Sequence, residues 1–116
     1  MKKAIIYHNP RCSKSRDTLT LLQKHHIEPQ VILYLESPPT VKQLKELLQL
    51  LNMKPRDLLR KSETEYKELN LDNTKLSDEA ILKAMIQHPK LIERPIVVIN
   101  NKAVLGRPPE NILELL

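Results

Sequence analysis

Residues 4–15 read AIIYHNPRCSKS, and this stretch decides how the fold begins. Its first four residues are apolar and β-prone, which predicts a short strand, and His8-Asn9-Pro10 is typical of a turn. Ser13 is expected to be the N-cap of a helix that follows the turn and extends to about residue 25. Cys12 is therefore expected to lie on a polar turn between a strand and the start of a helix.

Further β-prone runs extend this beginning into a sheet. Residues 31–35 read VILYL and predict a second, buried strand, parallel to the first and joined to it by a right-handed crossover. Residues 96–99 read IVVI, the strongest strand signal in the chain. Asn100-Asn101 is a favourable two-residue turn, which predicts a hairpin with a strand at 103–105. Pro108-Pro109 then opens a last helix.

The segment between these two units, at about 37–89, contains only helical signals. Thr40 and Ser77 are expected to be the N-caps of two amphipathic helices, and Pro55 suits the first position of a short helix between them. The order β-α-β, helices, β-β-α predicts an α/β protein with a thioredoxin/glutaredoxin-like fold and a mixed sheet, in which the helical segment is an insertion. We expect one domain that covers residues 1–116.

The composition is typical of a small globular protein. The chain has 116 residues, of which 41% are hydrophobic and 28% charged. No run approaches the roughly 20 apolar residues that are needed to span a membrane. The apolar part of the N-terminus is strand-sized and has no cleavage site, so it does not resemble a secretory signal. We therefore expect a cytoplasmic protein, and we expect a monomer.

The formal net charge of +5 favours anionic partners, which include small oxyanions, acidic proteins and nucleic acid. Nucleic acid is disfavoured because the basic residues are scattered along the chain and only three tyrosines could stack on bases. Taken alone, the charge is equally well explained by solubility.

Cys12 is the only cysteine in the chain. A single cysteine cannot form an internal disulfide, which fits a reducing compartment. It also excludes zinc sites that need two or four cysteines, and we expect neither a metal nor a bound cofactor. A redox cycle at Cys12 would have to take its second thiol from another molecule.

The position of Cys12 favours a reactive thiolate. Unpaired backbone N–H groups and the dipole at a helix N-terminus favour negative charge, Arg11 and Lys14 flank the thiol, and His8 is expected nearby. The same N–H groups could hold an oxyanion, so that the nucleophile and the anion site would coincide. The alternative, a small buried hydrophobic cysteine, is disfavoured by the polar turn around it.

Two familiar classes of thiol enzyme are excluded by spacing. Protein tyrosine phosphatases need an arginine after five intervening residues, and that position is Thr18. Dithiol thioredoxins need a second cysteine three positions after the first, and that position is Ser15.

The pattern His8-Asn9-Pro10-x-Cys12-x-x-Ser15, followed by three separate arginines, resembles the ArsC family of glutathione- and glutaredoxin-coupled arsenate reductases. Further matching motifs follow in order over nearly the whole chain: Tyr34 to Thr40, Leu58-Leu59-Arg60-Lys61, Gln87-His88-Pro89, Glu93 to Val98 and Gly106 to Glu110. The residues around Cys12, Arg11 and Ser13-Lys14, are more similar to the YfgD-like subgroup.

The resemblance implies an oxidoreductase of thioredoxin-like fold that reduces arsenate to arsenite. In such enzymes the cysteine that matches Cys12 attacks arsenate as a thiolate, and arginines that match Arg60, Arg94 and Arg107 hold the oxyanion. Glutathione is the co-substrate, glutaredoxin the partner, and the proline that matches Pro95 is cis. Planar guanidinium groups grip an oxyanion in a bidentate manner, which lysine cannot do.

Two more residues are candidates for stabilising the thiolate. His8 ends the first strand, where a histidine can also be purely structural. Ser15 lies one turn into the helix, and its hydroxyl could donate a hydrogen bond to the Cys12 thiolate or only support the first turn.

Two other functions are compatible with the same residues. The first is a glutathione-dependent thiol oxidoreductase with another substrate, such as a protein mixed disulfide. The second is a regulator that binds RNA polymerase, like the Spx proteins, although Ser15 replaces the second cysteine of their redox switch.

Overall fold

The computed structural model describes residues 3–116, and the chain divides into two compact units. The first combines the chain up to Ser37 with Arg94–Leu116, and the second is Pro38–Glu93. The prediction of one domain with a helical insertion stays a prediction, and each unit is described by itself.

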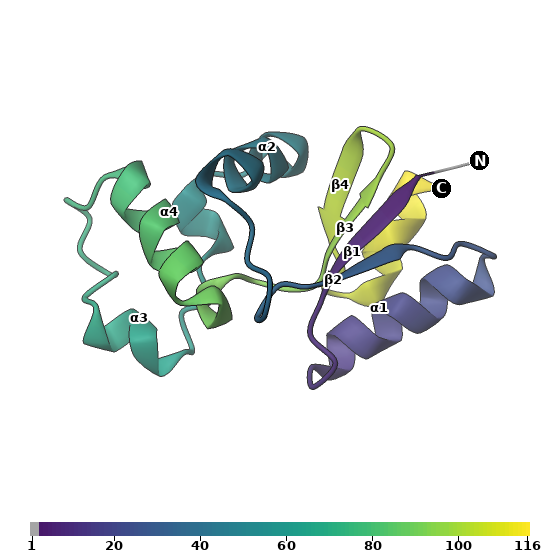
Figure 1. Ribbon diagram of the computed structural model, residues 1–116, viewed down its shortest axis with the longest axis horizontal. Helices are drawn as coiled ribbons and strands as arrows, with labels where there is room; N and C mark the ends of the chain where they lie inside the picture. The colour runs from purple at the N-terminus through teal and green to yellow at the C-terminus, as the bar shows by residue number, and fades with distance from the viewer. Residues whose placement is uncertain (1–2) are drawn as a thin grey trace. The chain divides into compact units, whose positions relative to one another are not determined.

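The first unit is built on a four-stranded mixed sheet with the strand order β2-β1-β3-β4 (Figure 1). Its strands are β1 (Ala4–His8), β2 (Gln30–Leu33), β3 (Ile96–Ile99) and β4 (Lys102–Leu105). The β1 strand pairs in parallel with β2 and antiparallel with β3, and β3 pairs antiparallel with β4. Together with the helices α1 (Ser13–Lys24) and η3 (Pro109–Leu115), they confirm the predicted thioredoxin-like α/β fold.

The core of this unit is aliphatic, as a chain without Phe and Trp requires. Side chains from β1, α1, β3 and η3 form one buried cluster, so both helices pack on the same face of the sheet (Figure 1). Ile6, Leu22, Val97 and Ile112 in that cluster are fully buried. Burial of each such side chain contributes about 1.5–3 kcal/mol, and the cluster packs α1 against β1.

Three predictions for this unit need correction. Ser13 is not the N-cap of α1 but its first residue, because Cys12 has the extended backbone (φ −95°, ψ 123°) of an N-cap and its carbonyl accepts from the Arg16 amide. The second strand ends at Leu33, since the Leu33 carbonyl accepts from the amides of Glu36 and Ser37 and turns the chain. It is also an edge strand with an exposed Val31, not a buried one.

The second unit contains only short helices among its described elements: α2 (Val41–Leu51), η1 (Pro55–Leu58), α3 (Thr64–Glu68), α4 (Asp78–Gln87) and η2 (Pro89–Leu91). Thr40 caps α2 in a reciprocal capping box with Gln43, and Ser77 caps α4, as predicted. The apolar faces of α2 and α4 contribute buried leucines, isoleucine and methionine to a core of their own. A bridge between Leu59 and Ile92 joins the segment that follows η1 to the end of the unit.

Candidate functional site

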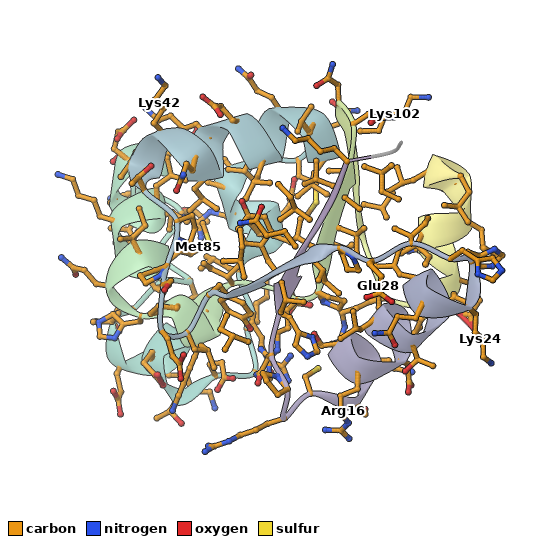
Figure 2. The ribbon with its side chains drawn as sticks, turned by 45° about the vertical axis from the view of Figure 1, so that its right-hand side comes forward. Arg16, Lys24, Glu28, Lys42, Met85 and Lys102 are labelled. Atoms are coloured by element: carbon orange, nitrogen blue, oxygen red, sulfur yellow. The ribbon has the colours of Figure 1, made fainter. Side chains whose placement is uncertain are left out.

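The turn between β1 and α1 holds Cys12 through hydrogen bonds to Asn9. The Cys12 amide donates to the Asn9 carbonyl at 3.0 Å, and the Arg11 amide donates to Asn9 Oδ1 at 3.0 Å. Asn9 is buried, and its side chain acts as the acceptor of an Asx turn. Arg16, labelled in Figure 2 at the start of α1, closes the turn by donating from Nη1 to the Pro10 carbonyl at 2.9 Å.

Cys12 is the N-cap residue of α1, and its thiol interacts with the backbone amides of Lys14 and Ser15. Burial raises the pKa of the Cys12 thiol, but the backbone amide of Ser15, the side chain of Arg94 and the backbone amide of Lys14 outweigh it, and the net pKa is lowered. The amide donors and the guanidinium charge all favour the thiolate over the thiol. The turn therefore presents a nucleophile that is ionised at lower pH than an ordinary cysteine.

Two of the three predicted arginines, Arg94 and Arg107, interact with the Cys12 thiol. Arg107 Nη1 lies 3.9 Å from Cys12 Sγ and donates to the Arg94 carbonyl at 3.3 Å. Arg94 is buried and lowers the pKa of Cys12 by hydrogen bonding and by charge, whereas Arg107 is exposed. The Arg94–Pro95 bond is cis, as the resemblance implied, and so is the Arg107–Pro108 bond.

Arg60 belongs to the second unit and is not among the residues that the first unit brings together. It follows η1, its amide donates to the Leu91 carbonyl at 2.7 Å, and its Nε lies 3.4 Å from Glu63 Oε1. Its expected role in holding an oxyanion stays a prediction.

The remaining predicted pair, His8 and Ser15, forms a buried contact under the turn. Ser15 Oγ lies 2.6 Å from His8 Nδ1 and accepts from the Asn9 amide at 3.0 Å. Burial and the nearby positive charge of Arg16 lower the pKa of His8, and both favour the neutral imidazole over the imidazolium. The Ser15 hydroxyl thus supports the turn, while the backbone amide of Ser15 interacts with the Cys12 thiol. Stabilisation of the thiolate by the His8 and Ser15 side chains stays a prediction.

A cavity of about 300 Å³ lies beside the turn on the side of β2. It is lined by residues 8–11 together with Leu33, Leu35 and Glu36. Within residues 3–116, no cluster of three or more His, Cys, Asp or Glu side chains could hold a metal ion. No helix in that part of the chain is both long and apolar enough to cross a membrane.

The Arg94 side chain offers a direct test of the thiolate. We expect Arg94→Met to move the pH midpoint of Cys12 alkylation by iodoacetamide upward by about one unit, because it removes a charge and a hydrogen bond that favour the thiolate. The rate is measured from pH 5 to 10 by mass spectrometry. Arg11→Met is the matched control, because Arg11 is the neighbour of Cys12 in the chain and its side chain is exposed. A midpoint that moved only in Arg11→Met would contradict this interpretation.

The chain is similar to several known proteins. The model of the ArsC family matches residues 7–115. The uncharacterized protein YfgD of Escherichia coli K12 is 56% identical over 98% of this chain and 97% of its own length. An arsenate reductase of Neisseria meningitidis is 47% identical over 97% of both chains. Among solved structures, an arsenate reductase from Vibrio cholerae superposes with a TM-score of 0.96, at 56% identity and 98% coverage of both chains.

Proposed function

Because this chain belongs to the ArsC family, we propose that it is an arsenate reductase whose nucleophile is the Cys12 thiolate. One observation carries the proposal: Arg107 Nη1 lies 3.9 Å from Cys12 Sγ, so an oxyanion bound by the guanidinium would lie against the nucleophile. Arg94 adds a second guanidinium that already favours the thiolate. Guanidinium groups also balance the charge of arsenate as it approaches an anionic sulfur.

The chemistry follows from the single thiol. The thiolate attacks the arsenic atom, and one hydroxyl of arsenate takes up a proton from solvent and leaves as water, which gives a sulfur–arsenic(V) adduct. Glutathione thiolate then attacks the Cys12 sulfur, a disulfide forms, and the sulfur–arsenic electron pair stays on arsenic, which leaves as arsenite. Glutaredoxin thiolate attacks the glutathione sulfur of that disulfide and releases Cys12. Arsenic gains two electrons and two external thiols are oxidised.

The three arginines have different parts in this scheme. Arg107 is exposed, so its guanidinium can bind the oxyanion as the substrate enters from solvent. Arg94 is buried and favours the thiolate form of Cys12. Arg60 would supply a third guanidinium, as in the family. Lysine would replace the charge at each position but not the planar pair of donors. Because the proposed cycle needs reduced glutathione and glutaredoxin, we propose that the protein acts in the cytoplasm, and that it acts as a monomer.

The test is arsenite formation by the purified protein with glutathione, glutaredoxin, glutathione reductase and NADPH, each thiol donor being omitted in turn. We expect turnover that requires both donors and that falls in Arg94→Lys and Arg107→Lys. Lys102→Arg is the matched control, because it changes a cation on β4 without touching Cys12. Absence of arsenite from the wild type, in the presence of a reactive Cys12, would reject arsenate as the substrate.

A second candidate is a glutathione-dependent oxidoreductase that acts on a mixed disulfide. The cavity of about 300 Å³ beside the turn supports it, because its Leu33 and Leu35 side could accept an apolar group of a peptide. Reduction of a glutathionylated peptide that persists in Arg94→Lys and Arg107→Lys would favour this candidate, since a disulfide carries no oxyanion to be held.

A further inference from the structure

The backbone that carries Arg107 is held by side chains from two helices. At the end of β4 and just beyond it, the carbonyls of Leu105 and Arg107 both accept from Asn111 Nδ2, at 3.0 and 3.2 Å. The Gly106 carbonyl between them lies 3.3 Å from Thr18 Oγ1, and the Gly106 amide donates to the Pro95 carbonyl at 2.9 Å. An amide NH₂ has two hydrogens, so Asn111 can serve both of its acceptors.

Thr18 connects this segment to the helix that Cys12 caps. It is fully buried on α1, and its Oγ1 also lies 2.7 Å from the Lys14 carbonyl, an ordinary contact for a helical threonine. A hydroxyl has one hydrogen, which the Lys14 and Gly106 carbonyls must share. Packing adds to the hydrogen bond: a Cβ on Gly106 would lie 2.5 Å from Thr18 Oγ1 and 2.9 Å from its methyl carbon. The backbone of Gly106 therefore rests directly on Thr18.

These contacts fix the position of the Arg107 backbone, from which its side chain extends. Arg107 is exposed, and a long exposed side chain has many rotamers. Its guanidinium reaches Cys12 Sγ and the Arg94 carbonyl from a backbone that is fixed on both sides by Asn111 and beneath by Thr18. A shift of that backbone would carry the guanidinium away from the thiol without changing either reacting group.

We propose that Thr18 and Asn111 are positioning residues, which hold the Arg107 backbone so that its guanidinium faces the Cys12 thiol. The proposal rests on the part given to Arg107 in the proposed function but not on arsenate as the substrate. A purely structural role, in which Thr18 only bonds within α1 and Asn111 only fastens η3, predicts a change in stability and no change that depends on Arg107.

The experiment measures the alkylation of Cys12 by iodoacetamide against pH, in the full chain and without arsenate. Thr18→Val and Asn111→Leu are each made in the wild type and in Arg107→Ala. We expect each to raise the pH midpoint by about half a unit in the wild type, because the thiolate loses a cation near 4 Å, and to add nothing in Arg107→Ala. Thr18→Ser keeps the hydroxyl and should restore the wild-type midpoint.

Thr20→Val is the matched control, because Thr20 is an exposed threonine on the same helix. Thermal unfolding shows whether each variant is folded. If Thr18→Val does not fold, the pH midpoint of Asn111→Leu tests the proposal, because Asn111 is only partly buried. Equal shifts with and without Arg107, or a loss of stability with an unchanged midpoint, would overturn the proposal. Because no arsenate is present, failure of arsenate turnover leaves this result intact, and the two failures are distinguishable.

Discussion

Cys12→Ser is expected to reduce arsenite formation to background, a loss of at least about a thousandfold. A serine hydroxyl stays protonated near neutral pH and cannot form the sulfur–arsenic adduct or the mixed disulfide with glutathione. No other thiol can replace it, because Cys12 is the only cysteine. Arsenite is measured directly and by NADPH consumption. Turnover above about one per cent of the wild type would show that the reaction does not pass through this sulfur.

The same variant should not lose stability. Cys12 is the N-cap of α1, and serine is among the preferred residues at that position. We therefore expect Cys12→Ser to keep or raise the free energy of unfolding, by up to about 1 kcal/mol, while activity disappears. Ser13→Ala, one residue further on the first turn, is the control for a nonspecific effect on the helix start. A lower melting temperature for Cys12→Ser would contradict the assignment of the cap.

Gly106→Ala is expected to lower the free energy of unfolding by about 2–4 kcal/mol. The added Cβ would lie 2.5 Å from Thr18 Oγ1 and 2.9 Å from Pro95 Cγ, both of which belong to ordered, packed segments. Neither α1 nor the backbone before β3 can withdraw without disturbing the cluster around Ile6 and Leu22. Urea unfolding, followed by circular dichroism, measures the loss.

The cause of that loss can be tested by coupling. Thr18→Ala removes two of the three close contacts of the new Cβ, so the double variant should lose less stability than the sum of the two single losses. Leu22→Ala creates a cavity at another point of the same unit. Its loss in the free energy of unfolding should therefore be closer to additive with the loss caused by Gly106→Ala. Strict additivity with Thr18→Ala would show that the glycine is required for another reason.

Most of the fold could be predicted because the local signals are strong and agree. The runs at 4–7 and 96–99, the turn at Asn100-Asn101 and the caps Thr40 and Ser77 are each decided by a few neighbouring residues. The cap of α1 was assigned wrongly because serine has the stronger preference for that position. The Cys12 amide instead bonds to the Asn9 carbonyl, and this turn keeps Cys12 extended.

The burial of β2 was predicted wrongly for a different reason. The apolar letters of residues 31–35 indicate a strand but not its place in the sheet, and strand order depends on distant pairings. Here β1 and β3 take the two central positions, which leaves β2 at an edge. Tyr34 is buried, although it lies beyond the end of that strand.

The site shows the same division between local and distant information. Cys12 and its turn could be predicted from adjacent residues, and the resemblance indicated Arg94 and Arg107. The sequence showed only that Thr18 occupies the position at which phosphatases carry an arginine. Its contact with Gly106 could not be predicted, because it joins residues far apart in the chain. The place of Asn9 in the turn could be predicted, since an asparagine before proline is typical of a turn.

The pairing of β1 with β3 has a consequence for synthesis of the chain. Ile6 lies opposite Val97, so the central pair of the sheet joins residues about ninety positions apart. A ribosome makes the thiol turn early and Arg94 and Arg107 late, and the long loop must close before the sheet is complete. We therefore expect Cys12 in a nascent chain to lack the part of its lowered pKa that Arg94 supplies. Its activation would mark completion of the protein.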